Sequence, residues 1–149
     1  MLHSYTKLYV HLIWGTKNRF NYFNKVIRDL VKDHILKYAK ENNIEVLSIN
    51  IQSDHLHLLI SLRSDQKVDD IVKRLKGESS HWINSENIIK PKFSWQRGYG
   101  AFSISSSHLD AVKNYIKNQD EHHKKVSFID EYKKILTKYG YSINNSNEL

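Results

Sequence analysis

Two short motifs carry the residue types that this chain could use for chemistry. His55 and His57 flank a leucine in an apolar run, and alternate side chains of a β-strand share one face, so the two imidazoles would project together. Tyr115 and Gln119 are four apart in a stretch with helical periodicity, which places a phenol and a carboxamide on one helix face. Two imidazoles and a carboxamide can hold a divalent metal, and a phenol beside that metal can attack phosphorus. Together the motifs suggest strand transfer on DNA.

The spacing of these residues is by itself a weak signal. Nine histidines in 149 residues are expected to produce about 0.5 His-x-His triplets by chance. The plainer interpretation is a strand with two half-buried histidines and a helix with an ordinary amphipathic tyrosine. Residue types and spacing alone favour that interpretation, so the surrounding segments must decide.

Hydrophobic periodicity predicts the elements that would position these side chains. Alternating apolar residues predict four strands, at about 8–14, 44–51, 55–62 and 99–105. Apolar residues at helical spacing predict four helices, at about 24–42, 68–82, 109–119 and 127–139. Ser107 with Asp110, and Ser127 with Asp130, resemble capping pairs for the last two helices, and Gly140 follows the final one.

The order β-α-β-β-α-β with added C-terminal helices favours an α+β fold of the ferredoxin-like or RRM-like type. An antiparallel sheet covered by helices on one face is then expected, with the first and third strands as central neighbours. The histidine pair would lie on the opposite face, which something else must cover. At 149 residues the chain is expected to be a single domain. Its predicted parts are a core at about 5–125, a C-terminal helix at about 127–139 and a frayed tail at 144–149.

The composition is basic and free of cysteine. There are 23 Lys and Arg against 16 Asp and Glu, a net charge of +7 and an isoelectric point near 9.5, which favour a polyanionic partner. The absence of cysteine excludes a disulfide framework, a thiolate metal site and a cysteine nucleophile. No signal core precedes the first strand, and no run approaches the roughly 20 apolar residues of a membrane span. We therefore expect a cytoplasmic protein without membrane contact.

Five segments, covering roughly residues 5–125, occur in an order that is specific to one family. They are Tyr9–Arg19 with its basic Lys17-Asn-Arg19, Asp54–Ile60 with His55-Leu-His57, Val72–Ser80 with Lys76-Gly-Glu-Ser-Ser80, Trp95–Phe102, and Val112–Gln119 with Tyr115-Ile-Lys-Asn-Gln119. This series resembles the HUH-type single-tyrosine transposases of the TnpA type, where HUH means His, a bulky apolar residue and His. Members of that family are insertion-sequence transposases that act on single-stranded DNA.

The resemblance implies a role for each motif. His55, His57 and Gln119 would hold Mg²⁺ or Mn²⁺, whereas ligand softness alone would favour Mn²⁺, Zn²⁺ or Ni²⁺ for two imidazoles. Tyr115 would be the nucleophile, leaving a 5′-phosphotyrosine and a free 3′-hydroxyl, and the sequence identifies no general base. Because the covalent link keeps the phosphodiester energy, no ATP is needed, in agreement with the absence of a G-x-x-x-x-G-K-[ST] loop. The resemblance also implies hairpin-ended DNA and a homodimer whose active sites each combine the histidines of one subunit with the tyrosine of the other.

Further residues are candidates for supporting roles. Cationic residues that could contact phosphates are Lys17, Arg19, Lys73, Arg74, Lys76 and Arg97. Trp95 and Tyr99 could stack on unpaired bases. His122 could be an alternative ligand or proton carrier, although a solvated helix end is the favoured interpretation of His122 and His123. His11 could lie on the active face or be an ordinary packed histidine.

Other functions fit parts of the pattern. A domesticated relative of the transposases, acting on chromosomal repeats, has no distinguishing mark in sequence. A non-catalytic, ferredoxin-like nucleic-acid-binding module would bind DNA or RNA without needing metal at the histidine pair. A two-histidine phosphoesterase would need two H-x-[ST] motifs, and none of the nine histidines begins one.

Overall fold

The computed structural model describes residues 3–143, and its elements follow the predicted β-α-β-β-α-β order. The strands are Leu8–Gly15 (β1), Glu45–Ile51 (β2), His55–Leu62 (β3) and Gly100–Ile104 (β4). The helices are Lys25–Glu41 (α1), Val68–Ser85 (α2), Leu109–Lys117 (α3), Gln119–His122 (α4) and Phe128–Lys138 (α5). Short 3-10 turns, Lys17–Arg19 (η1) and Ser106–His108 (η2), follow β1 and β4. The predicted frayed tail at 144–149 lies outside the described residues.

The strands form one antiparallel sheet in the order β2-β3-β1-β4. The first and third strands are therefore the central pair, which confirms the prediction from their alternation. In this pairing His57 lies opposite Ile13, and His55 lies opposite Gly15. Both imidazoles thus sit near one end of the two strands whose backbones are best fixed by neighbours on either side.

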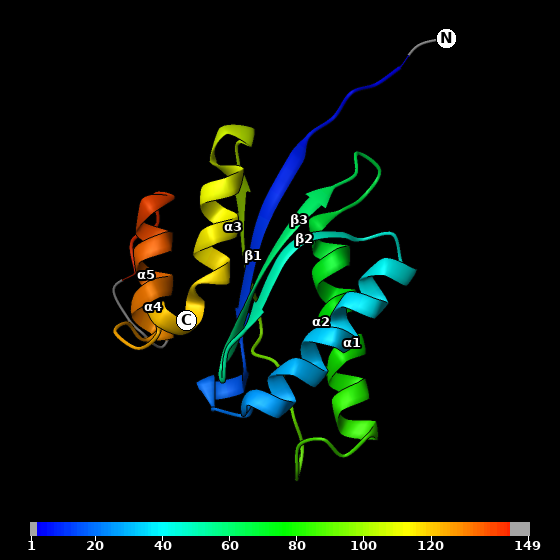
Figure 1. The fold of residues 1–149 in the computed structure, drawn as a ribbon, viewed down its shortest axis with the longest axis vertical. Coiled ribbons are helices and arrows are strands. Elements are labelled where there is room, and N and C mark those ends of the chain that lie inside the picture. Colours follow the sequence, from blue (N-terminus) through cyan, green and yellow to red (C-terminus); the bar gives the residue numbers. More distant parts are fainter. Residues whose placement is uncertain (1–2, 144–149) are drawn as a thin grey trace.

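Helices cover both faces of the sheet. Figure 1 shows α1 and α2 on one side and α3 with α5 on the other. The first face holds the larger core, where Leu12, Trp14, Leu56, Leu58 and Ile60 are fully buried against the two long helices. Burial of these side chains supplies the main hydrophobic stabilisation of the domain.

The second face carries a smaller core that explains why α5 docks. Ile13 and Phe102 project from the sheet and pack against Phe128, Tyr132 and Leu136 of α5. These two apolar strand residues would otherwise be exposed to water, and the helix predicted at 127–139 supplies the cover that this face needs. The long helix pair and α5 therefore bury opposite faces of the same strands.

Two strand glycines let α5 approach the sheet closely. A Cβ on Gly15 would lie 2.8 Å from the ring of Phe128, and a Cβ on Gly100 would lie 2.9 Å from the hydroxyl of Tyr132. Both distances are well below van der Waals contact, so any side chain at either position would push against the helix.

The ends of the C-terminal helices differ in how well they were predicted. Ser127 caps α5 by accepting the backbone N–H of Asp130, as expected. The capping role predicted for Ser107 is wrong, because a 3-10 turn precedes α3 and the Ser107 hydroxyl contacts Ser105 and His108 instead. The tyrosine helix also breaks at Asn118, so Gln119 begins α4.

Within residues 3–143, no helix is both long and apolar enough to cross a membrane.

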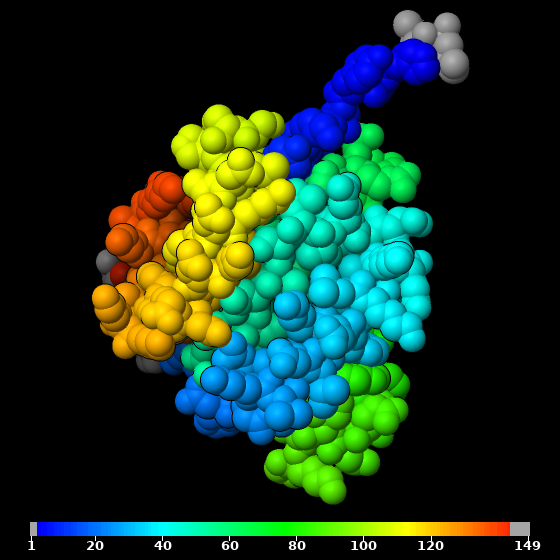
Figure 2. Space-filling model, viewed as in Figure 1, coloured from blue at the N-terminus to red at the C-terminus, as the bar shows by residue number. Residues whose placement is uncertain are grey.

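The segment before β1 leaves the body of the molecule. Space-filling Figure 2 shows this N-terminal stretch projecting beyond the sheet, while α3 lies directly against the surface of β2 and β3. Tyr5 in the projecting stretch is 91% exposed.

Candidate active site

The histidine pair of β3 lies under the C-terminal helices, with both rings on the same face of the sheet. His55 is 1% exposed and His57 is fully buried, and their ring centroids are 5.2 Å apart. The ring of Phe128 stacks on His55 at 4.1 Å with an interplanar angle of 7°. The second-face position predicted from strand alternation is therefore confirmed.

The tyrosine motif meets the histidine pair within a single chain. The ring of Tyr115 lies 5.8 Å from that of His57, edge to face. Gln119 is fully buried beside it, even though the helix breaks between the two residues. His11, on the neighbouring strand, completes this side of the site, with its Nε2 2.8 Å from Nδ1 of His57.

A carboxylate from α5, absent from the sequence prediction, lies at the centre of the site. Glu131 is 2% exposed, and its Oε1 lies 3.0 Å from Nε2 of His57 and 3.5 Å from Nε2 of His55. Its Oε2 accepts hydrogen bonds from the hydroxyl of Tyr115 and, at 3.0 Å, from Nε2 of Gln119. One carboxylate therefore connects both predicted motifs.

The end of α4 and the turn that follows it add two more imidazoles, those of His122 and His123. His123 Nε2 lies 3.1 Å from Oε1 of Glu131, and its side chain is 13% exposed. His122 Nε2 lies 3.3 Å from Oε2 of the same carboxylate, with the side chain half-buried. The favoured interpretation of both as a solvated helix end is wrong, because the chain turns here and brings α5 back over the site.

Burial and charge set the protonation states of the buried groups. Burial raises the pKa of Tyr115 well above its ordinary value, and the hydrogen bond to the Glu131 carboxylate raises it further, so the phenol is protonated. Burial opposes ionisation of Glu131, but contacts with His123, His55 and His57 outweigh it and hold the pKa far below its usual range. Glu131 is therefore a carboxylate.

The histidines differ from one another in the same environment. Burial lowers the pKa of His57, and burial together with the neighbouring His57 lowers the pKa of His11 to about 3, so His11 is neutral. Burial also acts to lower the pKa of His55, but its contacts with Asp54 and Glu131 outweigh burial and the net shift is upward.

The residues present fit a divalent metal ion. One ligand atom from each of four residues lies within 4.8 Å of the others, namely His55, His57, His123 and Glu131. Nε2 of His55 and Oε1 of Gln119 are buried and have no hydrogen-bond partner. Buried polar atoms without partners are costly in a folded protein, and a cation held by the histidine and carboxylate groups would satisfy them.

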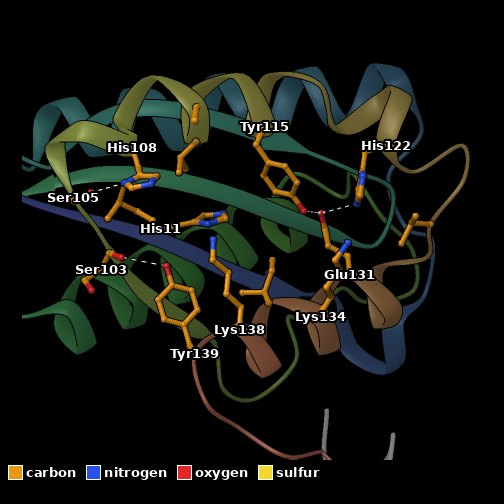
Figure 3. Close-up of a pocket in the computed structure, with 15 residues that line it drawn as sticks. His11, Ser103, Ser105, His108, Tyr115, His122, Glu131, Lys134, Lys138 and Tyr139 are labelled. Atoms are coloured by element: carbon orange, nitrogen blue, oxygen red, sulfur yellow. Dashed lines mark hydrogen bonds and ion pairs between the residues drawn. The ribbon is translucent and has the colours of Figure 1, made fainter.

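A cavity of about 850 Å³ opens beside this cluster, between α3, α5 and the end of β4. Figure 3 shows the hydroxyl of Tyr115 meeting the carboxylate of Glu131 on one side of the cavity, with His11 on its floor. Lys134 and Lys138 also line it, from the exposed side of α5. This partly cationic cavity therefore gives an extended, anionic ligand direct access to the phenol.

The predicted nucleic-acid contacts are scattered over the molecule. The interpretation of Trp95 as a base-stacking residue is wrong, since it is 8% exposed, packs among aromatic core residues and donates its indole N–H to Ser79. Lys76 is half-buried and donates to the backbone carbonyls of Gln96 and Gly98.

The remaining candidates lie on α2, in the turn after β1 and in the segment before β4. Lys73 and Arg74 are exposed on α2, in the layer opposite the site, and Tyr99 is half-buried and bonded to Asp69. Lys17 and Arg97 are exposed, while Arg19 is half-buried at the turn after β1.

Comparison with known proteins identifies the class to which this fold and site belong. Residues 4–119 match the family described as "Transposase IS200 like". Because this match covers most of the chain, the protein belongs to the IS200-like transposase family and is a DNA transposase. His123 and Glu131 lie beyond the matched residues.

Individual relatives agree with this assignment. The chain is 30% identical over 120 residues to the ISDra2 transposase TnpA of Deinococcus radiodurans, covering 77% of this chain and 86% of the relative. It is 26% identical over 119 residues to the transposase for insertion sequence element IS200 of Salmonella typhimurium, covering 76% and 78%.

Two solved structures share the fold. The crystal structure of a candidate transposase from Deinococcus radiodurans R1 aligns with a TM-score of 0.63 and 27% identity, over 80% of this chain and 95% of that one. A REP-associated tyrosine transposase bound to a REP hairpin aligns with a TM-score of 0.64 and 16% identity, over 85% and 74%.

Proposed function

We propose that this transposase cleaves and rejoins single-stranded DNA through a covalent bond to Tyr115, and so excises and inserts a mobile element. The observation that carries the proposal is the placement of the Tyr115 phenol beside the histidine pair, at 5.8 Å between the rings of Tyr115 and His57. In the proposal His55, His57 and Gln119 hold Mg²⁺ or Mn²⁺. Such an ion supplies positive charge that stabilises the oxygens of the phosphate during attack.

The chemical step exchanges one phosphodiester for another. The Tyr115 oxygen attacks phosphorus, the bond from phosphorus to the 3′-oxygen breaks, and that oxygen takes a proton to become a free 3′-hydroxyl. The strand remains attached to the protein as a 5′-phosphotyrosine, and attack by another 3′-hydroxyl reverses the exchange. Across the whole exchange the phenolic proton ends on the leaving 3′-oxygen, and the hydrogen bond that Tyr115 donates to Glu131 orients the phenol for attack.

The cavity offers the place where the strand would reach the phenol. Single-stranded DNA carries one phosphate per nucleotide, and Lys134 and Lys138 line the cavity on the exposed side of α5. We include hairpin ends in the proposed substrate, in accordance with the sequence resemblance. Of the predicted surface contacts, Lys17, Arg19 and Arg97 remain proposed DNA contacts, as do Lys73, Arg74 and Tyr99.

We also propose a homodimer with shared active sites, in which Tyr115 of one subunit works with the histidines of the other. Within one chain the tyrosine also lies beside its own histidines, so both arrangements have to be compared. A His55→Ala, His57→Ala variant mixed with Tyr115→Phe tests this. A heterodimer recovers one intact site if the tyrosine acts in trans, and none if it acts in cis.

The decisive experiment is covalent capture of DNA. Labelled single-stranded DNA from the flanks of the gene, incubated with the protein and Mn²⁺, should yield a protein–DNA adduct on a denaturing gel. Tyr115→Phe should abolish the adduct, whereas Tyr141→Phe, which removes the hydroxyl of an exposed tyrosine, should leave it. An adduct that survives Tyr115→Phe would assign the chemistry to another residue. No adduct with wild-type protein, despite DNA binding, would favour a non-catalytic nucleic-acid-binding module.

A further inference from the structure

We propose that His123 and Glu131, which lie beyond the family match, are ligands of the metal together with His55 and His57. Together with Gln119 of the proposed function, the centre would then have three imidazoles, one carboxamide and one carboxylate, and α5 would supply its only anionic ligand. This inference rests on the proposed function, since it concerns the composition of the same site.

The distances from Glu131 to the three imidazoles fit a single ion. From Oε1 of Glu131, the Nε2 atoms of His57, His123 and His55 lie at 3.0, 3.1 and 3.5 Å. Ligands at about 2.0–2.1 Å from a tetrahedral ion are separated from one another by about 3.3 Å. The three distances from Glu131 therefore have the spacing of a coordination shell, and the four ligand atoms all lie within 4.8 Å of one another.

The hydrogen bonds of the outer ring nitrogens point to the same conclusion. Nδ1 of His55 lies 2.7 Å from a carboxylate oxygen of Asp54, and Nδ1 of His123 lies 2.7 Å from the carbonyl oxygen of Val126. Both partners only accept, so each Nδ1 carries a proton and donates it. A histidine that binds metal is commonly held in this way by a donated N–H on its other nitrogen.

This arrangement leaves a conflict that a cation would resolve. In the neutral rings of His55 and His123, the Nε2 atoms have lone pairs, and both face an oxygen of the Glu131 carboxylate. In a buried site, a lone pair on a ring nitrogen and a carboxylate oxygen that face each other repel each other. Either a cation lies among them or both rings take up a second proton, and these two alternatives give different results in a metal titration.

The other half of Glu131 connects the centre to the nucleophile. Its Oε2 accepts from the hydroxyl of Tyr115 and from Nε2 of Gln119, while Phe128, one turn earlier on α5, stacks on His55. The helix therefore carries the carboxylate and fixes the ring of one proposed ligand. Three imidazoles also alter the expected metal, because nitrogen-rich sites favour Mn²⁺ or Zn²⁺ over Mg²⁺.

The test is calorimetric titration of the intact chain with Mn²⁺ at neutral pH, without DNA. Wild-type protein should bind one ion, and Glu131→Gln should weaken the Kd by at least about tenfold, the smallest loss typical of groups that support a metal. His123→Ala should act in the same direction. Asp130→Asn removes the same charge from an exposed neighbour on α5 and should leave the Kd unchanged.

Each result has a defined consequence. If His55→Ala and His57→Ala abolish binding while Glu131→Gln and His123→Ala keep a Kd close to wild type, the metal site stands and this inference is overturned. If the variants at His55 and His57 also bind normally, the proposed function loses its metal. Should Glu131→Gln fail to fold, Glu131→Asp, which keeps the charge but withdraws it by one methylene, should show the same loss of affinity. A wild-type protein that binds no Mn²⁺ or Zn²⁺ would mean that protonated histidines balance Glu131.

Discussion

Replacing Phe128 by alanine should detach α5 from the sheet. Phe128 is 4% exposed and packs against the smaller core and the ring of His55. Large-to-small changes of buried Phe typically cost 3–5 kcal/mol, and the cost is lower where the site can collapse. Because the smaller core lies at one side of the molecule, we expect about 3 kcal/mol, at the lower end of that range.

The assay must separate loss of α5 from unfolding of the whole domain. Urea unfolding gives the global value, and a loss of about 3 kcal/mol corresponds to roughly 6–12 °C in Tm for a chain of this size. Hydrogen exchange of the α5 amides gives the local value, which should fall first because the larger core on the opposite face is untouched. Phe20→Ala is the control, since Phe20 is 53% exposed and surface changes usually stay within about 0.5 kcal/mol. A Phe128→Ala protein with wild-type stability and wild-type exchange in α5 would refute the assigned packing.

Three further predictions follow from other parts of the structure. Gly100→Val should destabilise the protein by about 1–3 kcal/mol in thermal melts, because the added side chain meets Tyr132; unchanged melting would mean that α5 lies farther from β4. Burial lowers the pKa of His11 in the folded protein to about 3, whereas in the unfolded chain it is about 6.5. The folded state therefore loses stability as the pH falls below about 6.5, by up to about 1.4 kcal/mol per pH unit, because the unfolded chain takes up a proton that the folded protein does not. His11→Asn should therefore flatten urea stability between pH 6 and 4, and an equally steep profile would contradict the assignment. Lys134→Ala with Lys138→Ala should reduce the salt dependence of single-stranded DNA affinity by about 0.7 per lost phosphate contact, with Lys37→Ala on the opposite layer as a control that keeps the wild-type slope.

Local patterns were enough to predict the sheet and the histidine face. The alternation around His55 and His57 has a period of two, and a one-residue slip would have moved Leu56 and Leu58 out of the larger core to the other face of the sheet. The placement of both imidazoles on one buried face follows directly from that alternation. The helix carrying Tyr115 could be predicted in the same way, although its break at Asn118 could not.

The contacts that complete the site are long-range, and no local pattern specifies them. Glu131 meets His57 across 74 positions of sequence, and the sequence predicted only that α5 would form and which side would be apolar. One signal was available, since Glu131 lies three residues after Phe128 and next to Tyr132, and so belongs to the buried side of the helix. Trp95 was misjudged for a related reason, because its polar and basic sequence neighbours suggested a surface loop while its contacts lie with Trp14 and Phe23.

The convergence of side chains on Glu131 has a consequence for how such a site changes through evolution. Its two oxygens are shared among Tyr115, Gln119, His57, His122 and His123. Replacing one of these partners alone leaves the others with buried polar atoms that have no hydrogen-bond partner. The resulting loss of stability is larger than when all of these residues are replaced together. A descendant that has abandoned the chemistry is therefore expected to lose these positions jointly. A lineage under selection for transposition should retain all of them.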